Sequence, residues 1–459
     1  MSDSQVKTQS LYAKQQKIHA REVDGFFSRI GKSTALWLLT VYYALPWITW
    51  TGRQAVLFDL PARKFYIFGI TLWPQDFIYL SWLLIMAALL LFLVTTVAGR
   101  LWCGYACPQT VWTKAFVWLE RLALGNYSKR KKLDKAALSR SKVARKALRN
   151  FLWVSFAFWT GFTFVGYFTP IRELGSSLVA FELGGWETFW VCFYSFATLG
   201  NAGFLREQVC KYMCPYARFQ SAMFDRNSLI IAYDTARGEP RGSHKRKKAS
   251  EGKLGDCIDC SICVQVCPTG IDIREGLQYE CIACAACVDA CNTVMDKVGL
   301  EPNLIGYTTQ NAIDGKPTHV MRPRTLVYTT LLSLLFITFL YSLFTRNPLS
   351  LDVIRDRNAL YRELSDGRIE NVYTLKVLNK SDETHELRIM AQGLEGLEVE
   401  TDPANPVLSS GELVVIAARV KVIPEAVKAG GHDIVLTIEA KEDAGMQADR
   451  ETRFFVPLD

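Results

Sequence analysis

The chain has 459 residues, half of them apolar, and a formal net charge of +8 at pH 7. This composition excludes a disordered chain, and the length allows two or three domains in addition to membrane spans. The positive charge gathers beside apolar segments, between Lys129 and Arg149 and again from His244 to Lys248. We interpret both groups as topology signals at a membrane lipid surface, with no nucleic acid as partner.

Five segments are apolar and close to the length of about 20 residues that crosses the hydrocarbon core of a membrane. The second contains no charged residue, whereas the first is short and contains Pro46. One such segment is equally typical of a buried helix, but five with basic flanks indicate a multi-pass membrane protein. The predicted spans are residues 34–50, 77–98, 151–169, 188–205 and 326–344.

The orientation of these spans follows from the loops that carry Lys and Arg, which stay in the cytoplasm. Residues 99–150 are strongly basic and are placed there, together with the N-terminus and the cysteine-rich stretch 206–325. Residues 345–459 then lie in the periplasm of a Gram-negative cell. The first 33 residues are polar and charged, so no cleavable signal peptide is visible and the first span serves as the anchor.

Two short cysteine motifs follow the predicted spans. CGYACPQ begins at Cys103 and CKYMCPY begins at Cys210, and both have the pattern C-x-Y-x-C-P. Each begins five residues after a span, has an Arg just before it and is followed by an amphipathic stretch. Residues 34–124 and 151–232 therefore look like two copies of one unit, related by a pseudo-twofold near the cytoplasmic face.

The two motifs predict one shared site of four thiols. Residues four apart lie on the same face of a helix, so the sulfurs of each pair can meet one ion or cluster. The Pro after each pair marks a kink or a helix start. Soft thiolates favour Cu(I), zinc or iron–sulfur centres, and the alternative is a set of buried, inert cysteines. The candidate catalytic and metal-binding residues are Cys103, Cys107, Cys210 and Cys214, whereas Cys192 stands alone in the fourth span and is interpreted as a packed core thiol.

Eight of the thirteen cysteines form two runs of the pattern C-x2-C-x2-C-x3-C. This is the bacterial ferredoxin spacing for two 4Fe–4S clusters, in which the fourth Cys of each run ligates the other cluster. Zinc is the alternative, but zinc sites usually separate two Cys pairs by a longer gap. Pro268 follows the first run and Asn292 the second, a difference that removes no ligand. The predicted ligands are Cys257, Cys260, Cys263 and Cys291 for one cluster and Cys281, Cys284, Cys287 and Cys267 for the other.

Other cofactors find little support in the sequence. None of the five His residues lies in a predicted span, so a membrane haem with two His ligands is excluded. No G-x-G-x-x-G follows a predicted strand, so a Rossmann site for NAD or FAD is not supported. Two clusters in one module form a relay for single electrons, which must come from another protein or a reduced small molecule.

The last part of the chain has the pattern of a small β-domain. NVYTLKVLNKS, HELRIMAQ, LVVIAARVKVIP and HDIVLTIEAK are rich in β-branched residues and are separated by turn residues. About five to seven such strands in roughly 100 residues are typical of an immunoglobulin-like β-sandwich. The segment has no Cys, and we interpret it as an interaction or structural domain.

The predicted fold is a multi-domain membrane protein of the bacterial inner membrane, with about five transmembrane helices. A cytoplasmic ferredoxin-like α+β module with two 4Fe–4S clusters is inserted in it, and an all-β immunoglobulin-like sandwich follows. The predicted parts are an N-terminal cytoplasmic segment at 1–33, a four-helix membrane domain with two C-x3-C-P repeats at 34–232, the ferredoxin-like domain at 233–325, the fifth helix at 326–344 and the periplasmic immunoglobulin-like domain at 345–459.

This order of parts resembles the FixG/RdxA/CcoG family of cytochrome c oxidase accessory proteins. The resemblance covers nearly the whole chain and includes GYTTQNAIDGK after the clusters and DRNALYRELSDGRIENVYTLKVLN at the start of the sandwich. It implies a cupric reductase that converts Cu(II) to Cu(I) on the cytoplasmic side, for assembly of cbb3-type oxidase. Copper is then a substrate or a ligand, and the implied partners are the oxidase or its assembly and copper-delivery proteins.

Two other functions stay open from the sequence. One is an electron-transfer subunit that exchanges electrons with quinone or a partner reductase, with a further cluster in the C-x3-C-P pairs. Such pairs also occur in membrane ferredoxin-type subunits of anaerobic reductase systems. The other is a non-enzymic assembly scaffold whose clusters are structural and whose sandwich docks an oxidase subunit. The sequence names no electron donor and leaves open whether the chain forms a homo-oligomer.

Overall fold

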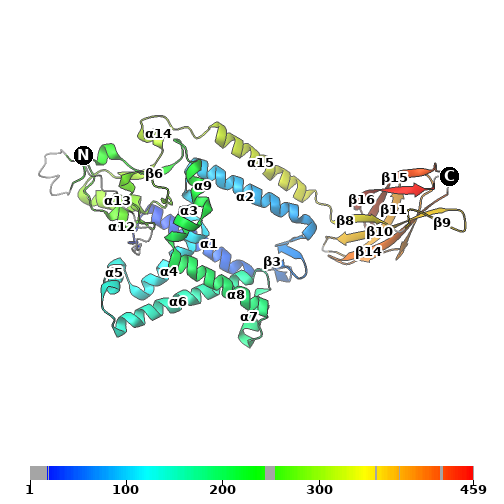
Figure 1. Ribbon diagram of the computed structural model, residues 1–459, viewed down its shortest axis with the longest axis horizontal. Coiled ribbons are helices and arrows are strands. Elements are labelled where there is room, and N and C mark those ends of the chain that lie inside the picture. The colour runs from blue at the N-terminus through cyan, green and yellow to red at the C-terminus, as the bar shows by residue number, and fades with distance from the viewer. Residues whose placement is uncertain are drawn as a thin grey trace, which may run out of the picture. The chain divides into compact units, whose positions relative to one another are not determined.

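The chain forms two compact units, Met1–Phe336 and Ile337–Asp459 (Figure 1). All thirteen cysteines belong to the first unit, so the candidate metal centres lie within it. The basic group from His244 to Lys248 lies outside the described residues. The computed structural model describes residues 18, 20–242, 254–356, 359–381, 383–423 and 427–457.

The first unit begins with helices and a few short strands. The helices are α1 (Phe26–Ala44), α2 (Phe77–Ala98), α3 (Leu101–Tyr105), α4 (Pro108–Leu124), α5 (Tyr127–Lys135), α6 (Arg140–Val165), α7 (Ile171–Ala180), α8 (Gly185–Thr198) and α9 (Pro215–Met223). The strands between α1 and α2 are β1 (Thr49–Trp50), β2 (Arg53–Gln54), β3 (Val56–Asp59), β4 (Lys64–Ile67) and β5 (Ile70–Leu72). They form two small antiparallel sheets, β1–β2 and β3–β4–β5.

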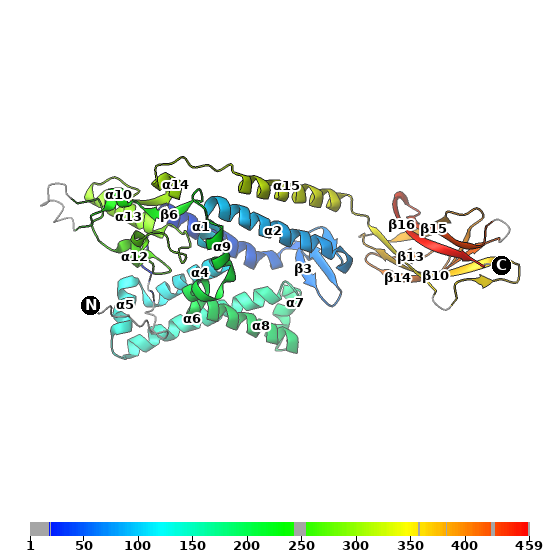
Figure 2. The same ribbon diagram turned by 45° about the horizontal axis from the view of Figure 1, so that its top comes forward.

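Helices α4, α6 and α8 pack into one bundle rich in aromatic side chains (Figure 1, Figure 2). Phe116 on α4 and Trp153 on α6 are buried in its core, where the Trp153 indole donates to the Phe116 carbonyl at 3.1 Å. Gly161 lets α6 approach α8, because a Cβ at this position would overlap Ser195 Oγ and lie 2.6 Å from the Val191 carbonyl. The bundle holds α4, which begins directly after the first C-x3-C-P motif.

Two helices of the described chain are long and apolar enough to cross a membrane, as judged by length and composition alone. They are α2 and α15 (Pro323–Phe344), which correspond to the second and fifth predicted spans. Of the most apolar window, 11% is buried in α2 and 0% in α15. An apolar helix that the protein itself leaves uncovered is what contact with lipid requires.

The other three predicted spans remain predictions. The first apolar segment ends as a helix at Ala44, the third is the second half of α6, and the fourth divides between α8 and the π-helical stretch Leu199–Leu205. Large apolar side chains are nevertheless exposed on α6 and α8, among them Phe151, Trp186 and Phe196. Exposed apolar surface of this kind marks a contact with lipid or another protein.

The ferredoxin-like module lies between α9 and α15 in the sequence. Its elements are β6 (Ile230–Tyr233), α10 (Thr235–Gly238), α12 (Ile262–Val266), α13 (Ala286–Val298), β7 (Ile305–Thr308) and α14 (Gln310–Ile313). Strands β6 and β7 pair antiparallel, with Ile231 opposite Tyr307. They close a core in which Met295, Leu304 and Ile305 pack with the cysteines. This arrangement agrees with the predicted α+β module.

The module also caps α1 at its N-terminus. Asp289 on α13 is 5% exposed, and its carboxylate accepts from the backbone N–H of Phe27 at 3.3 Å and of Ser28 at 2.7 Å. Gly25, at the N-cap position, leaves room for this carboxylate, because a Cβ there would overlap Asp289 Cγ. A carboxylate at this place satisfies free N–H groups and faces the positive end of the helix dipole.

The second unit is a sandwich of two antiparallel sheets. Its strands are β8 (Leu349–Arg355), β9 (Arg362–Glu363), β10 (Ile369–Asn379), β11 (His385–Gln392), β12 (Glu398–Asp402), β13 (Val407–Leu408), β14 (Leu413–Val422), β15 (Gly430–Ala440) and β16 (Asp443–Val456). One sheet has the order β12–β14–β10–β8, with β9 beside β10, and the other has the order β13–β11–β15–β16.

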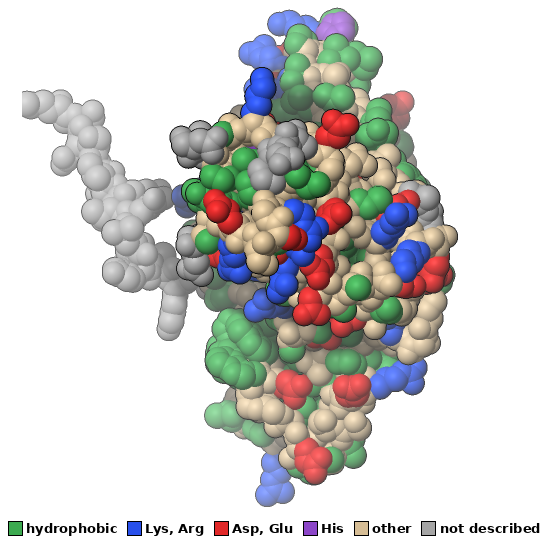
Figure 3. Space-filling model, turned by 90° about the vertical axis from the view of Figure 1, so that its right-hand side faces the viewer, with side chains coloured by type: hydrophobic (Ala, Val, Ile, Leu, Met, Phe, Trp, Pro, Cys, Tyr) green, Lys and Arg blue, Asp and Glu red, His purple; other side chains and the backbone are tan. Residues whose placement is uncertain are grey.

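The core of the sandwich comes from alternate residues of both sheets. Tyr373, Leu375 and Val377 on β10 are fully buried in the same cluster as Leu436 and Ile438 on β15. The four quoted segments form β10, β11, β14 and β15, so the predicted β-sandwich is confirmed. On the face shown in Figure 3, Lys and Arg side chains are interspersed with Asp and Glu.

We expect Asp289→Ala to lower the thermal unfolding midpoint of the purified full chain, because α1 loses its cap. Loss of a capping side chain costs about 0.5–2 kcal/mol of stability. Asp289→Asn keeps one acceptor oxygen and should lose less. Asp296→Ala, at an exposed position of the same helix, is the matched control. Equal midpoints for Asp289→Ala and this control would contradict the cap.

Candidate metal centres

Three cysteines of the first run and one of the second line a cavity in the ferredoxin-like module. Cys257 and Cys260 come from the loop before α12, Cys263 from α12 itself, and Cys291 from α13. Tyr233 and other apolar side chains complete the wall. The structure therefore brings together the first predicted ligand set, including the member from the other run.

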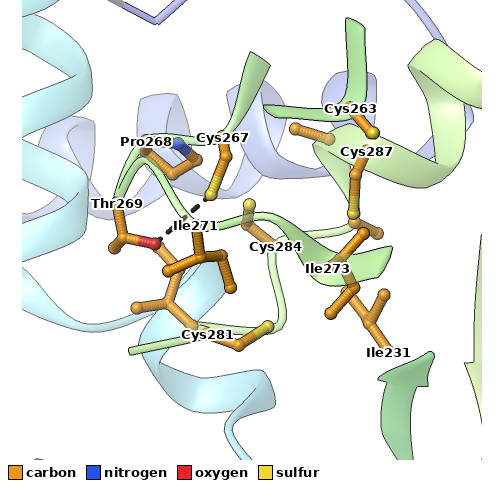
Figure 4. Close-up of a pocket in the computed structure, with 13 residues that line it drawn as sticks. Ile231, Cys263, Cys267, Pro268, Thr269, Ile271, Ile273, Cys281, Cys284 and Cys287 are labelled. Carbon is orange, nitrogen blue, oxygen red and sulfur yellow. Dashed lines mark hydrogen bonds between the residues drawn. The ribbon is translucent and has the colours of Figure 1, made fainter. Parts of the chain in front are cut away.

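A second cavity is lined by the complementary set of cysteines and also by Cys263, which lies between the two cavities (Figure 4). Cys281 and Cys284 come from the loop before α13, Cys287 from the first turn of α13, and Cys267 from the end of the first run. Cys267 Sγ lies 3.3 Å from Thr269 Oγ1. The second predicted ligand set is thus also together, and the role of each cysteine as a ligand stays a prediction.

The two runs share one backbone conformation. Asp259 and Ser261 in the first run, and Ala283 and Ala285 in the second, have φ values between 52° and 56°. These positions lie two and four residues after the first Cys of each run. Left-handed residues in such turns direct successive N–H groups into one concavity, an arrangement that binds anions and occurs at many iron–sulfur sites. The loops therefore have the form that an anionic cluster requires.

Burial makes the thiols of Cys284 and Cys291 hard to ionise without a metal. It raises the pKa of Cys284 to about 12 and the pKa of Cys291 to about 12. Neighbouring thiols raise both further, Cys267 beside Cys284 and Cys263 beside Cys291. Metal ligation needs thiolates, so cluster binding must release protons and contribute to folding. The thiol donor sets and the concave loops fit two iron–sulfur clusters.

The first cavity is lined by one positively charged side chain, whose charge is neutralised by neighbouring carboxylates. Arg274 lines the cavity, and its side chain is 8% exposed. It forms ion pairs with Asp259 and Asp272, at 2.7 Å each. The hydrogen bond from Arg274 lowers the pKa of Asp272. Cys260, in the same cavity, is exposed to solvent.

The two C-x3-C-P pairs are built alike, but neither pair lies on one continuous helix. Cys103 is on α3 and Cys107 is the N-cap of α4, while Cys210 is on a short π-helical stretch and Cys214 is the N-cap of α9. The prediction that each pair shares one helical face is therefore wrong. The Pro after each pair begins a new helix, which places Cys107 and Cys214 at the positive ends of helix dipoles.

The four thiols of these motifs lie near one another. Burial raises the pKa of Cys103 to about 12, and the neighbouring thiols Cys107 and Cys210 raise it further. Burial also raises the pKa of Cys107, which Cys214 raises as well. The backbone N–H groups of Thr110 and Gln109, in the first turn of α4, act in the opposite direction on Cys107. Helix N-termini favour thiolates in this way.

Each half of the first unit completes the cysteine motif of the other half. Gln220, on α9, accepts through Oε1 from Arg100 Nε at 3.1 Å and from Cys103 Sγ at 3.2 Å. In return Gln109, on α4, donates to the Arg206 carbonyl at 3.0 Å, near the second motif. The exchange agrees with the predicted pair of related units and explains why the motifs meet.

The spacing of the thiols bears on what they can bind. Among the residues that the structure describes, no three His, Cys, Asp or Glu side chains lie close enough to ligate one metal ion. Thiolates on a cluster bind different iron atoms and stand farther apart than ligands of one ion, so the two cluster cavities agree with this spacing. For the C-x3-C-P cysteines, it favours a larger bound species or an ion held by two thiolates.

Cys192 is exposed, so its prediction as a packed core thiol is wrong. It lies on the face of α8 that also carries the exposed side chains of Phe189, Phe193 and Phe196, at helical spacings of three and four residues. The apolar sequence around Cys192 therefore belongs to an outer face of the bundle.

The sequence pattern does not single out four residues that organise these centres, namely Arg100, Gly104, Gln220 and Asp289. An Arg before each motif is visible as part of the repeat, although its role is not. Gly104 and Asp289 have only their position beside cluster or motif cysteines as a signal. Gln220 has no signal in a single sequence, because its partners come from a distant part of the chain.

Three family models match the chain. A 4Fe–4S binding domain matches residues 80–124, a 4Fe–4S dicluster domain matches residues 205–310, and an "IG-like fold at C-terminal of FixG" matches residues 339–457. The first match contains Cys103 and Cys107. The predicted ferredoxin-type module and the immunoglobulin-like domain are confirmed.

Three curated relatives match most of the chain. Nitrogen fixation protein FixG of Rhizobium meliloti is 40% identical over 422 residues, which cover 84% of this chain and 80% of that protein. Protein RdxB of Cereibacter sphaeroides is 38% identical over 481 residues, or 99% of each chain. Protein RdxA of the same organism is 40% identical over 410 residues, or 85% of each chain. This chain belongs to the FixG/RdxA family. It is an iron–sulfur protein of the oxidoreductase type, involved in electron transfer, and the predicted family is confirmed.

Because the fourth Cys of each run lies in the cavity of the other run, replacing it should affect the cluster held mainly by that other run. Cys291→Ser should remove the signal of the cluster held mainly by the first run, because Cys291 lies in that cavity, and Cys267→Ser should remove the other. The module should also lose stability, since cluster binding is coupled to folding. Electron paramagnetic resonance of the reduced proteins distinguishes the two clusters, and Cys192→Ser is the control. Loss confined to the cluster of Cys291's own run would rule out the crossed assignment.

Proposed function

We propose that this protein is a membrane-bound cupric reductase that converts Cu(II) to Cu(I) for assembly of cbb3-type cytochrome c oxidase. The supporting observation is that the four C-x3-C-P thiols lie near one another and that α3, the helix of Cys103, lies beside the loop that carries Cys281 and Cys284. Membership of the FixG/RdxA family supports the electron relay. The copper substrate and the oxidase partner are the parts that the proposal adds.

The proposed chemistry uses the thiols as a soft site for the product. When bound, the clusters supply electrons one at a time. One electron converts Cu(II) to Cu(I), and a one-electron donor protein or a reduced small molecule replaces it in the ferredoxin-like module. Cys103, Cys107, Cys210 and Cys214 bind Cu(I) in preference to Cu(II), because thiolates are soft ligands, and this preference helps to drive the reduction.

The proposed topology places this chemistry on the cytoplasmic side. Helix α5 and the first half of α6 are rich in Lys and Arg, which stay on the inner side of a membrane. With α2 and α15 as spans, the ferredoxin-like domain at 233–325 is cytoplasmic and the sandwich at 345–459 is periplasmic. The sandwich then serves as a docking domain for oxidase or copper-delivery partners.

A second candidate function has a specific observation in its favour. The family model that contains Cys103 and Cys107 is itself a 4Fe–4S binding domain. In this alternative the four C-x3-C-P thiols hold a further cluster, and the protein passes electrons to quinone or to a partner reductase. Among the described residues, the spacing of the thiols is too wide for three of them to ligate one ion, which favours the same alternative.

The double change Cys103→Ala with Cys107→Ala separates these functions. We expect the variant to keep about eight Fe per chain and unaltered ferredoxin spectra, as two four-iron clusters require. Reduction of Cu(II) by the prereduced protein should be lost, and bound copper should fall. Iron and copper analysis of anaerobically purified protein, with a Cu(I)-specific chelator as the reporter, makes the measurement.

Cys192→Ala is the matched control, because Cys192 is a thiol of the same membrane part that no proposed site uses. It should keep both copper binding and reduction. Loss of about four Fe from the double variant would mean that the pairs hold a cluster, in favour of the second candidate. Unchanged iron, copper and activity would show that the pairs are structural.

The topology has its own test. A reporter that is active only in the periplasm should be active when fused after Asp459. The same reporter should be silent when fused after Gly315, a turn residue whose Cβ position is open, with no other atom within 4 Å. The reverse pattern would overturn the cytoplasmic placement of the metal centres.

A further inference from the structure

The two cluster cavities differ in what lies around them. The first contains the exposed Cys260, and its cation, Arg274, is held by the carboxylates of Asp259 and Asp272. The second adjoins α3, the helix of Cys103, through the loop of residues 281–284. One cavity therefore includes an exposed thiol, and the other faces the thiol motif.

Gly104 is a point of close approach between α3 and this loop. A Cβ at Gly104 would lie 2.8 Å from the Ile282 carbonyl oxygen, 2.9 Å from Cys284 Cα and 3.0 Å from the Ala283 carbonyl oxygen. These are backbone atoms, which cannot rotate away as the end of a side chain can. Any larger residue must push the loop and α3 apart, so the missing side chain sets the distance between them.

A buried hydrogen-bond chain joins the same two places. Cys103 Sγ donates to Gln220 Oε1 at 3.2 Å, and Arg100 Nε donates to the same oxygen at 3.1 Å. The Arg100 guanidinium also donates to the Cys281 carbonyl at 3.3 Å and to the Tyr279 carbonyl. Arg100 is only 3% exposed. The chain therefore connects the first motif to the cluster loop without passing through solvent.

The charge of Arg100 distinguishes the second cavity from the first. These bonds of Arg100 go to amide and carbonyl oxygens, which carry no formal charge, whereas two carboxylates pair with Arg274. Lys114 adds a cation close by and donates to the Gly104 carbonyl at 3.0 Å. Nearby positive charge favours the reduced, more negative form of an iron–sulfur cluster. Electrons within the module should therefore collect at the second cavity.

We propose that electrons leave the ferredoxin-like module at the loop of residues 281–284, with Gly104 and Arg100 as positioning residues for transfer to the thiols beside Cys103. The inference rests on the proposed function, since it takes this site as the acceptor. With clusters bound by the cysteines of the module, each transfer would move one electron from the module to Cu(II), which would become Cu(I), and no proton would move. A one-electron donor protein replaces that electron on the side of the exposed Cys260.

The first test uses Gly104→Ala in the full-length, cluster-loaded protein. Reoxidation of the prereduced clusters by Cu(II), followed by rapid-mixing absorbance, should be slower by about tenfold or more, a typical cost of disturbing residues that support a metal centre. Iron should stay at about eight per chain. Gly175→Ala is the matched control, because this helical glycine has room for a Cβ, with its nearest neighbour at 3.8 Å. An unchanged rate in Gly104→Ala would overturn the exit at this loop.

The second test does not depend on copper. Arg100→Met should shift the reduction potential of the second cluster to a lower value and leave that of the first unchanged, as measured by redox titration with paramagnetic resonance. Arg100→Lys keeps the charge and should restore most of the potential. Equal shifts of both clusters, or no shift, would overturn the inference. This test also decides the matter if Gly104→Ala loses its iron.

The outcomes separate this inference from the proposed function. If the unaltered protein reduces Cu(II) and Gly104→Ala does so equally fast, the exit is wrong and the cupric reductase proposal stands. If the unaltered protein fails to reduce Cu(II), the proposed function fails. A selective shift of the second cluster in Arg100→Met would then still support this loop as the place where electrons collect.

Discussion

Packing of cysteine side chains into one small hydrophobic core is the constraint on which the first unit depends. Cys257 and Cys263 belong to the hydrophobic cluster of the module, and Cys281, Cys287 and Cys291 pack against it. A core that contains cysteine ligands is complete only when those cysteines hold their iron–sulfur clusters. We therefore expect folding of the module to be coupled to acquisition of iron, with the pairing of β6 and β7 closing the core.

In the helical part of the first unit, the two halves exchange supporting residues. Arg206 forms a buried ion pair with Glu120 on α4, and Arg100 bonds Gln220 on α9. Each arginine thus belongs to one cysteine motif and contacts the helix that follows the other. Neither half holds its own thiols in place alone, which makes the four-thiol neighbourhood a property of the assembled unit. Because α3 also packs on the loop of residues 281–284, the first cysteine motif is in direct contact with the ferredoxin-like module.

The cysteines of the ferredoxin-like module are predictable from the sequence because iron–sulfur ligands follow short, fixed spacings along the chain. The crossed sets of Cys267 and Cys291 follow from a known pattern, and each lies in the cavity predicted for it. The β-sandwich is predictable for a similar reason, because the alternation of apolar and polar residues along β10 and β15 indicates which side chains are buried. Patterns with a period of two, or with fixed ligand spacing, depend only on neighbours in the chain.

The features that the sequence does not predict depend on residues that are close in space but distant along the chain. Helical spacing placed each C-x3-C-P pair on one face, but Pro108 and Pro215 start new helices and break that periodicity. An apolar stretch such as that around Cys192 has the same composition whether it faces a core or lipid. Composition alone therefore predicts a buried Cys192, whereas the structure has it exposed. Gly104 matters through backbone atoms nearly 180 residues away along the chain, at Cys284, which no local pattern records.

The cap on α1 links the N-terminal segment to the part of the chain that carries the predicted cluster ligands. Asp289 stands between two predicted cluster ligands, Cys287 and Cys291, so its carboxylate depends on the same segment of α13 that carries them. Arg21, just before α1, is tied to the same module through the Gln265 carbonyl at 2.8 Å. We therefore expect loss of the clusters to loosen these contacts of the N-terminal segment as well.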